Sequence, residues 1–267
     1  MKKDNTKEIL DSFFRKLEYA EHSLLMLDYD GTLAPFRREK DKAFPYEGIR
    51  HILNEIIENG TTRVVIITGR WTQDIIPLLG LENRPEIWGS HGIERLMPNY
   101  EPTKPDIMNF DEITMKGLAE IDLWVENNGL TERAEHKPGC IAIHWRGMKP
   151  VNITKLKNKI TQNLTPVAEK YKLMLSEFDG GMEIRVPGRD KGYAVETLLG
   201  EMPNDTASAY LGDDYTDEDA FEAIAGKGLS VLVRKQFRPT NADIWIKPPE
   251  QLIQFLQIWN KIIGGKR

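Results

Sequence analysis

Acidic residues and a glycine gather where a short apolar run of the sequence ends. Asp28 and Asp30 come directly after the run at residues 24–27, and Gly31 follows them. Because side chains along a strand alternate with a period of two, both carboxylates point to the same side as the strand finishes. Gly31 permits a tight turn that brings backbone N–H groups towards a ligand. A surface turn is the competing interpretation, since Asp and Gly are common turn residues.

A second acidic group follows another apolar run. Asp213, Asp214 and Asp217 come after residues 209–211. A helix that starts with acidic residues and is capped by Thr216 would explain Glu218 and Asp219. It does not explain Asp213 and Asp214, which directly follow the strand. Five carboxylates in one cleft repel one another unless a divalent cation lies among them. Because neither cysteine nor clustered histidine is near, these oxygen ligands predict Mg²⁺ rather than zinc.

The reaction that such groups suit is attack on phosphorus. A carboxylate can form an acyl phosphate, and a second carboxylate two residues on can move protons. Attacker and target are both anionic, so positive charge must be arranged around them. Lys191, which opens a predicted helix, is a candidate for that charge, although a single lysine at a helix start is more often exposed. Thr68 and Gly69, which follow the apolar run at 64–67, offer a hydroxyl and a close approach to a phosphoryl oxygen.

The elements that must position these groups alternate between apolar strands and helical stretches. Apolar periodicity predicts helices over residues 5–19, 47–59, 72–79, 191–202 and 217–224 and strands over 24–27, 64–67, 86–89 and 209–211. Continuous apolar strands are typical of a parallel sheet covered on both faces. Ligands of such sheets bind at the carboxyl ends of the strands, where the acids lie.

The middle of the chain has a different order. A helix, two strands (131–136 and 141–146), a long helix and two more strands (173–178 and 182–186) are predicted, with a turn at Asp179-Gly180-Gly181. This order predicts a small α+β unit at residues 108–187, inserted into an α/β domain made of 1–107 and 188–267. Proline-containing linkers are expected at 102–105 and 187–188.

Composition excludes several other classes of protein. The chain has 267 residues with a net charge of −5, so nucleic acid or an anionic membrane is not the expected main partner. The single cysteine, Cys140, excludes a disulfide framework and a cysteine-based zinc site. No segment has the roughly 18–20 apolar residues that cross a bilayer, and residues 1–8 lack the apolar stretch of a signal peptide. We expect a cytoplasmic monomer that acts on a small molecule.

These residue groups resemble, in the same order, the four motifs of the haloacid dehalogenase (HAD) superfamily. The resemblance rests on Asp28-x-Asp30-Gly31-Thr32, Thr68-Gly69-Arg70, Lys191 and Gly212-Asp213-Asp214-x-x-Asp217. It implies a doubly wound, mostly parallel, Rossmann-like α/β core with an inserted α+β cap domain of the C2 type.

The resemblance also implies catalytic roles. Asp28 would be the nucleophile and Asp30 the general acid and base, while Thr68 and Lys191 would hold the phosphoryl group. The implied Mg²⁺ site consists of Asp28, Asp30 through its backbone carbonyl, Asp213, Asp214 and Asp217.

A narrower resemblance, to trehalose-6-phosphate phosphatases, covers most of the chain. It rests on residues 28–35, on 89–94, and on the segments Glu135-x-Lys137, His144-Trp145-Arg146 and Glu183-Ile184-Arg185. It implies a phosphoric monoester hydrolase that releases phosphate from trehalose 6-phosphate through a phosphoaspartate. The expected substrate-binding residues are Gly31, Thr32, Gly69, Arg70, His91, Gly92, Glu135, Lys137, His144, Arg146, Glu183 and Arg185.

Several alternatives stay open from the sequence. The substrate could be a related sugar phosphate, such as a glucosylglycerol or mannosylglycerate phosphate, and a phosphomutase or a non-catalytic sugar-phosphate sensor would use similar motifs. Glu135 and Lys137 could form a cross-strand ion pair on a solvated face. His144 could be a core or edge histidine, His91 a surface residue, and Arg70 a partner of either the phosphate or a core acid.

Overall fold

The computed structural model describes residues 5–37, 39–98, 106–107, 109–178 and 180–265. Contacts divide the chain into two compact units, Met1–Asp106 with Asp190–Arg267, and Ile107–Arg189. The domain boundaries expected at 107/108 and 187/188 stay a prediction. The linker expected at 102–105 and the Asp179 position of the expected turn lie outside the described residues.

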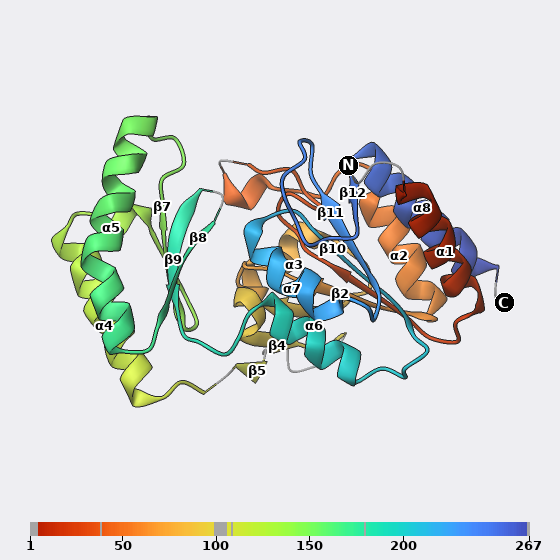
Figure 1. Ribbon diagram of the computed structural model, residues 1–267, viewed down its shortest axis with the longest axis horizontal. Helices are drawn as coiled ribbons and strands as arrows, with labels where there is room; N and C mark the ends of the chain where they lie inside the picture. Colours follow the sequence, from red (N-terminus) through yellow and green to blue (C-terminus); the bar gives the residue numbers. More distant parts are fainter. Residues whose placement is uncertain (1–4, 38, 99–105, 108, 179, 266–267) are drawn as a thin grey trace. The chain divides into compact units, whose positions relative to one another are not determined.

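The larger unit is built on a sheet whose strands run mostly parallel (Figure 1). Within the described residues eight strands pair in the order β12-β11-β10-β1-β2-β3-β4-β5. Neighbours from β12 to β3 are parallel, and β3 and β4 are antiparallel. The strands are β1 (Ser23–Leu27), β2 (Thr62–Ile67), β3 (Glu86–Gly89), β4 (Glu94–Leu96), β5 (Asp106–Ile107), β10 (Ala207–Gly212), β11 (Leu229–Val233) and β12 (Ile244–Ile246).

Helices cover both faces of this sheet, which explains why its central strands are apolar throughout. In β1, Leu25 and Leu27 belong to one buried cluster, and Leu24 and Met26 belong to the other. The first cluster is shared with α1 (Thr6–Tyr19), α2 (Ile49–Asn59), α3 (Thr72–Leu79) and α8 (Glu250–Gly264). The second is shared with α6 (Lys191–Gly200) and α7 (Glu218–Ile224). Full burial of each such side chain stabilises the fold by about 1.5–3 kcal/mol.

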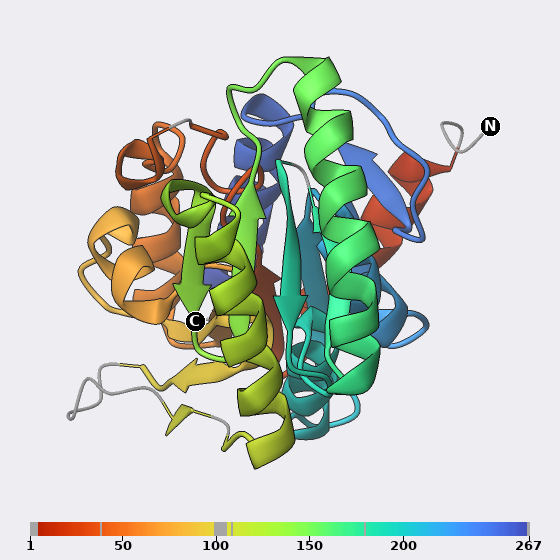
Figure 2. The ribbon, with the colours of Figure 1, turned by 90° about the vertical axis from the view of Figure 1, so that its left-hand side faces the viewer.

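The smaller unit is a four-stranded antiparallel sheet with two helices on the same side (Figures 1 and 2). The strand order is β6-β7-β9-β8, from β6 (Ala134–Lys137), β7 (Cys140–His144), β8 (Met174–Phe178) and β9 (Gly181–Arg185). The helices are α4 (Glu112–Asn127) and α5 (Pro150–Lys170). The Asp111 side chain caps α4 by accepting the N–H of Thr114 at 2.7 Å.

Short 3₁₀ turns, η1 (Lys40–Lys42), η2 (Ser90–Gly92), η3 (Thr131–Arg133) and η4 (Tyr215–Asp217), complete the described elements. The predicted strand at 131–136 is partly wrong, because η3 occupies its first half and only the second half, which reaches a pairing partner in β7, is extended. β7 also ends at His144, so Trp145 and Arg146 lie in the turn that follows. In the described part of the chain no helix is long and apolar enough to cross a membrane.

The predicted fold class is confirmed. A mostly parallel α/β sheet with helices on both faces is present, and a separate antiparallel sheet occupies the inserted segment. The run at 24–27 and the runs at 64–67 and 209–211 are adjacent strands, β1, β2 and β10, whose carboxyl ends share one edge.

Candidate active site

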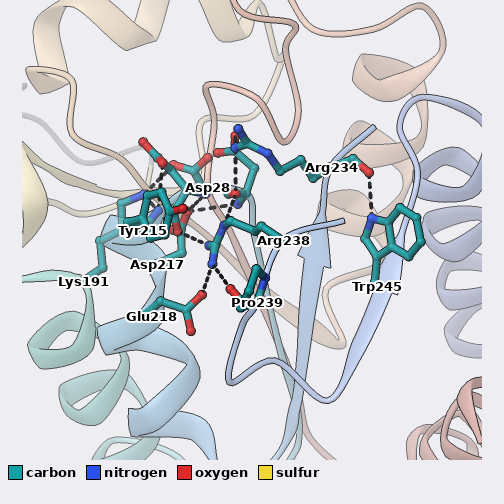
Figure 3. A network of polar contacts seen from close by, with 11 residues as sticks. Asp28, Lys191, Tyr215, Asp217, Glu218, Arg234, Arg238, Pro239 and Trp245 are labelled. Atoms are coloured by element: carbon teal, nitrogen blue, oxygen red, sulfur yellow. Dashed lines mark hydrogen bonds and ion pairs between the residues drawn. The ribbon is translucent and has the colours of Figure 1, made fainter. Parts of the chain in front are cut away.

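A buried lysine joins two acids at that edge (Figure 3). Lys191, the first residue of α6, places its Nζ 2.8 Å from Asp28 Oδ1 and 2.7 Å from Asp217 Oδ1. The three side chains are 3%, 4% and 0% exposed, so the ion pairs are shielded from water. Burial works against the charge of Lys191, but the two carboxylates outweigh it and raise the pKa of the ammonium group. The lysine is therefore a fixed positive charge beside Asp28.

Three acids form a group that is compact enough to share a cation. Asp28, Asp213 and Asp217 each offer a carboxylate oxygen, and these oxygens lie within 4.8 Å of one another. Gly31 allows this packing, because a Cβ there would lie 2.1 Å from Asp213 Oδ2. The first and fourth motifs thus meet at a place where only glycine fits.

Two oxygens of this acidic group have no hydrogen-bond donor. Asp28 Oδ2 and Asp213 Oδ1 are buried and accept no hydrogen bond from any residue that the structure describes. Burial raises the pKa of Asp28 to about 7 and holds the pKa of Asp213 well above its ordinary value, with the neighbouring carboxylates adding to both effects. Mg²⁺ prefers oxygen ligands, so two buried carboxylate oxygens without a hydrogen-bond donor suit a divalent cation.

Asp217 differs from the other two acids because its oxygens are already satisfied. Its Oδ1 accepts from Lys191 and from the Tyr210 hydroxyl at 2.5 Å, and its Oδ2 accepts the backbone N–H groups of Asp213 at 2.9 Å and Asp214 at 2.8 Å. Burial alone would raise its pKa, but Lys191 and these hydrogen bonds outweigh burial and lower it. Asp217 therefore holds the turn after β10 in shape.

Asp214 lies outside the compact acidic group, although the sequence predicts it as a ligand. Its Oδ1 accepts the N–H of Tyr215 at 2.8 Å, which caps η4. Asp30 also lies outside that group. Its carboxylate faces Arg70, whose Nε is 2.5 Å from Oδ2 and whose second terminal nitrogen is 2.6 Å from Oδ1. Of the two roles open for Arg70, the structure shows the pairing with a core acid.

Thr68 and Gly69 lie in the loop that follows β2. The Thr68 hydroxyl is buried and accepts the N–H of Arg70 at 3.1 Å, so its own proton is left to donate. A Cβ on Gly69 would lie 2.5 Å from Nε2 of His91, so the imidazole is packed against this loop and is not a surface group. Gly92 follows with φ +95°, and a Cβ there would meet the carbonyl oxygen of Asp190 at 2.7 Å. Thr32 is fully buried, and its hydroxyl has no hydrogen-bond partner within the described part of the chain.

The predicted sugar-binding residues lie in the smaller unit. Register places Glu135 and Lys137 of β6 on the same face as Glu183 and Arg185 of β9, and His144 of β7 shares it. The alternate residues of β7 and β9, Ile141, Ile143, Met182 and Ile184, are buried and apolar on the opposite face. The sheet therefore has one apolar face and one face rich in charge.

Polar contacts link these groups along the charged face. His144 Nε2 lies 2.8 Å from Glu135 Oε2, and Lys137 Nζ lies 3.8 Å from the same oxygen. Glu183 is buried and lies 3.4 Å from Arg185 Nε. Arg146 is placed differently, in the turn beyond β7, where a Cβ on Gly180 would lie 2.7 Å from its Nε.

Two arginines near the acidic group were not predicted. Arg238 donates from Nε to the carbonyl of Asp213 at 3.3 Å and from a terminal nitrogen to the carbonyl of Asp214 at 2.5 Å (Figure 3). Arg234 donates to the Asp213 carbonyl at 3.2 Å and lies 3.5 Å from Asp213 Oδ2. A strand prediction for β11 would have pointed to them, because β11 belongs to the same parallel sheet and Arg234 directly follows its carboxyl end.

Comparison with known proteins agrees with the resemblance in the sequence. A family model described as trehalose-phosphatase matches residues 26–245. Trehalose-phosphate phosphatase B of Arabidopsis thaliana is 30% identical over 91% of this chain and 67% of its own length. Probable trehalose-phosphate phosphatase C of the same plant is 29% identical over 93% of this chain and 80% of its own length.

Solved structures agree on the fold. The C-terminal domain of the trehalose-6-phosphate phosphatase of C. albicans superposes with a TM-score of 0.77 at 20% identity, covering 94% of this chain and 96% of that one. A haloacid dehalogenase-like hydrolase from B. subtilis has a TM-score of 0.62 at 16% identity, covering 88% and 99%. Since the family model spans most of the sequence, the chain belongs to the trehalose-phosphatase family of phosphoric monoester hydrolases.

Proposed function

We propose that the protein hydrolyses trehalose 6-phosphate to trehalose and phosphate, with Asp28 as the nucleophile. The observation that carries the proposal is the buried contact of Lys191 with Asp28, beside the unpartnered oxygens of Asp28 and Asp213. A carboxylate held against a fixed ammonium group can approach an anionic phosphoryl group with less repulsion. The relatives named as trehalose-phosphate phosphatases support the choice of substrate.

The proposed reaction has two steps. An oxygen of Asp28 forms a bond to phosphorus while the bond between phosphorus and the sugar oxygen breaks, and Asp30 gives its proton to that oxygen. Water then attacks the phosphorus of the phosphoaspartate, Asp30 takes a proton from that water, and the bond to Asp28 breaks to release phosphate. We propose that the Thr68 hydroxyl and the Lys191 ammonium group hold the phosphoryl oxygens through both steps.

The acidic group fits Mg²⁺, because two buried carboxylate oxygens there accept no hydrogen bond from the residues described. We propose Asp28, Asp213 and the backbone carbonyl of Asp30 as the residues that hold it. Mg²⁺ bound there would supply positive charge against the carboxylates and the phosphoryl group. The four hydrogen bonds on Asp217 favour a positioning role for that residue, and the cap on η4 favours the same for Asp214.

We propose that the charged face of the smaller sheet binds the sugar hydroxyls. A polyol needs several charged or bidentate hydrogen-bonding groups, and Glu135, Lys137, His144, Glu183 and Arg185 share this face. Arg146, Gly31, Thr32, Gly69 and Gly92 stay predictions as substrate contacts. Location in the cytoplasm and a monomeric state also stay predictions from the sequence.

Release of inorganic phosphate from a panel of sugar phosphates, with Mg²⁺ and with EDTA, tests this function. The panel contains trehalose 6-phosphate, glucosylglycerol phosphate, mannosylglycerate phosphate, glucose 6-phosphate and p-nitrophenyl phosphate. A kcat/KM at least about tenfold higher for trehalose 6-phosphate than for the other substrates supports the assignment. Tenfold corresponds to a difference of about 1.4 kcal/mol in activation free energy. Equal rates on all hexose phosphates would reject this assignment and indicate a phosphatase of broad substrate specificity.

A matched pair of substitutions tests the sugar-binding face. Glu183→Gln should raise KM for trehalose 6-phosphate while leaving hydrolysis of p-nitrophenyl phosphate unchanged, because the second substrate has no sugar. Glu177→Gln in β8 is the control, since this glutamate lies on the other face and pairs with the exposed Lys157. Equal effects of both substitutions would contradict a sugar-binding role for Glu183.

A further inference from the structure

Glu94, at the start of β4, is a buried carboxylate with no role in the proposed reaction. It is fully buried, and the hydrogen bonds that it accepts from the described residues come from uncharged groups. The Ser90 hydroxyl donates to Oε2 at 2.9 Å, the backbone N–H of Thr72 donates to Oε2 at 3.2 Å, and the Thr72 hydroxyl donates to Oε1 at 3.1 Å. Burial raises the pKa of Glu94, and these hydrogen bonds lower it only in part. Burying a carboxyl group without a cation is unfavourable, so its position calls for an explanation.

The residues beside it adopt an unusual backbone conformation. Ser90 and His91 have φ values of +48° and +57°, in the left-handed region that residues other than glycine rarely adopt. Two such residues in succession persist only where the surroundings hold them. The Ser90 side chain is held by Glu94, and Gly89 leaves room for that contact, since a Cβ there would lie 2.8 Å from Glu94 Oε2.

This strained turn is bonded to the loop that carries Thr68 and Arg70. The N–H of Ser90 donates to the carbonyl of Arg70 at 2.8 Å, and the N–H of His91 donates to the carbonyl of Thr68 at 3.0 Å. The imidazole of His91 packs on Gly69, between those two residues. Two carbonyl groups of the loop, those of Thr68 and Arg70, are thus hydrogen-bonded to the strained turn.

The far end of the same loop is also bonded to Glu94. Thr72 begins α3, and both its N–H and its hydroxyl donate to the carboxylate. One carboxylate therefore connects the start of α3 with the Ser90–His91 turn, and the loop of residues 68–71 runs between the two. Displacing the carboxylate would release the loop from both sides.

We infer that Glu94 is a positioning residue for the loop of residues 68–71. It acts through Ser90 and Thr72 and so fixes Thr68, Arg70 and the neighbouring His91. The inference depends on the proposed function, because the loop matters only if Thr68 holds a phosphoryl group. A carboxylate, which only accepts hydrogen bonds, suits this place because Ser90 and Thr72 both donate to it. Glutamine has the same shape but presents an N–H group where a donor already points.

The test compares Glu94→Gln with Glu86→Gln. Glu86 is a matched control: it is equally buried, it begins the adjacent strand β3, and its partners are Arg63, Arg95 and Trp88 rather than the loop. We expect Glu94→Gln to lower kcat at least tenfold with less than a threefold change in KM, both for trehalose 6-phosphate and for p-nitrophenyl phosphate. Glu86→Gln should lower the melting temperature but leave kcat within twofold of wild type.

Two outcomes overturn the inference. One is a folded Glu94→Gln protein with kcat within twofold of wild type, and the other is an equal loss of kcat in Glu86→Gln. If Glu94→Gln does not fold, Thr72→Val and Ser90→Ala each remove one hydroxyl donor and keep the carboxylate. Each should lower kcat at least threefold, and wild-type kcat in both would also overturn the inference.

A measurement that needs no activity separates this inference from the proposed function. Hydrogen exchange by NMR reports on the amides of Ser90 and His91, which are bonded to the loop. Glu94→Gln should speed their exchange at least tenfold, whereas Glu86→Gln should not. If the wild-type protein released no phosphate, the proposed function would fail, and unchanged exchange in Glu94→Gln would reject the connection to the loop separately.

Discussion

Arg70 holds both carboxylate oxygens of Asp30, at 2.5 Å and 2.6 Å. The same guanidinium donates to the carbonyl of Lys40 at 2.8 Å and lies 5.6 Å from the centre of the Tyr29 ring. Arg70 comes from the loop after β2, and Asp30 comes from the turn after β1. The pair therefore fixes the proposed general acid across two strand ends.

The first prediction concerns this pair. Arg70→Ala should lower kcat for trehalose 6-phosphate about tenfold or more, because general acid–base catalysis contributes about 10²–10⁴-fold and depends on the position of the acid. p-Nitrophenolate needs little protonation as it leaves, so kcat/KM for p-nitrophenyl phosphate, which reports the transfer of phosphate to Asp28, should fall much less than kcat/KM for trehalose 6-phosphate. Arg70→Lys keeps the charge without the two-pronged contact and should give intermediate rates. Equal losses of kcat/KM on both substrates would show that Arg70 does not act through protonation of the leaving group by Asp30.

The second prediction concerns Mg²⁺ and pH. Burial raises the pKa of Asp28 to about 7 and raises the pKa of Asp213 as well. A carboxyl whose pKa is higher in the folded than in the unfolded chain stabilises the fold below the unfolded pKa of about 4, and this stability is lost as the pH rises towards 7. Because protons compete with Mg²⁺ for these oxygens, the gain in melting temperature on adding Mg²⁺ should grow from about pH 5 to about pH 8.

The control for the Mg²⁺ prediction is Asp213→Asn, which removes one of the two carboxylates that have an oxygen without a hydrogen-bond donor among the described residues. It should abolish most of the Mg²⁺-dependent gain at every pH. A gain of constant size from acid to alkaline pH, or one that survives in Asp213→Asn, would argue against these acids as ligands.

The third prediction concerns Arg238. Its side chain donates to the carbonyls of both Asp213 and Asp214 and stacks over the Tyr215 ring at 4.7 Å. Arg238→Ala should raise the Mg²⁺ concentration needed for half-maximal activity several-fold, because the turn that presents Asp213 loses two hydrogen bonds worth about 1 kcal/mol each.

Arg95→Ala is the matched control for Arg238→Ala. Arg95 is also fixed by hydrogen bonds, to Glu86 and Glu201, but it does not contact the acidic turn. The Arg95→Ala substitution should destabilise the fold without altering activation by Mg²⁺. A similar change in Mg²⁺ requirement in both variants would indicate a general loss of stability instead.

Sequence patterns were sufficient where one local signal determined the structure. The runs at 24–27, 64–67 and 209–211 are apolar because both faces of the sheet are covered, and the acids follow because the strand ends form the site. The start of α6 at Lys191 also followed from sequence, since Asp190 caps it by accepting the N–H of Tyr193 at 2.7 Å. These features depend on residues close together in the chain.

Features that depend on distant pairing were not predictable in this way. β11, β12 and α8 carry no chemical motif of their own, so the arginines after β11 were missed with them. The opposite roles proposed for Asp213 and Asp217 rest on which of their oxygens already have donors, and the side-chain donors to Asp217 come from α6 and β10. The pairing of Arg70 with Asp30 likewise joins residues 40 positions apart.

A phosphoaspartate at Asp28 can be trapped and identified directly. The protein is quenched with acid during turnover of trehalose 6-phosphate, treated with borohydride to reduce an acyl phosphate to an alcohol, and digested for mass spectrometry. We predict homoserine at position 28, dependent on substrate and Mg²⁺, and no modification or turnover in a folded Asp28→Asn protein. Steady turnover with position 28 unmodified, or with reduction at another acid, would show that Asp28 is not the nucleophile.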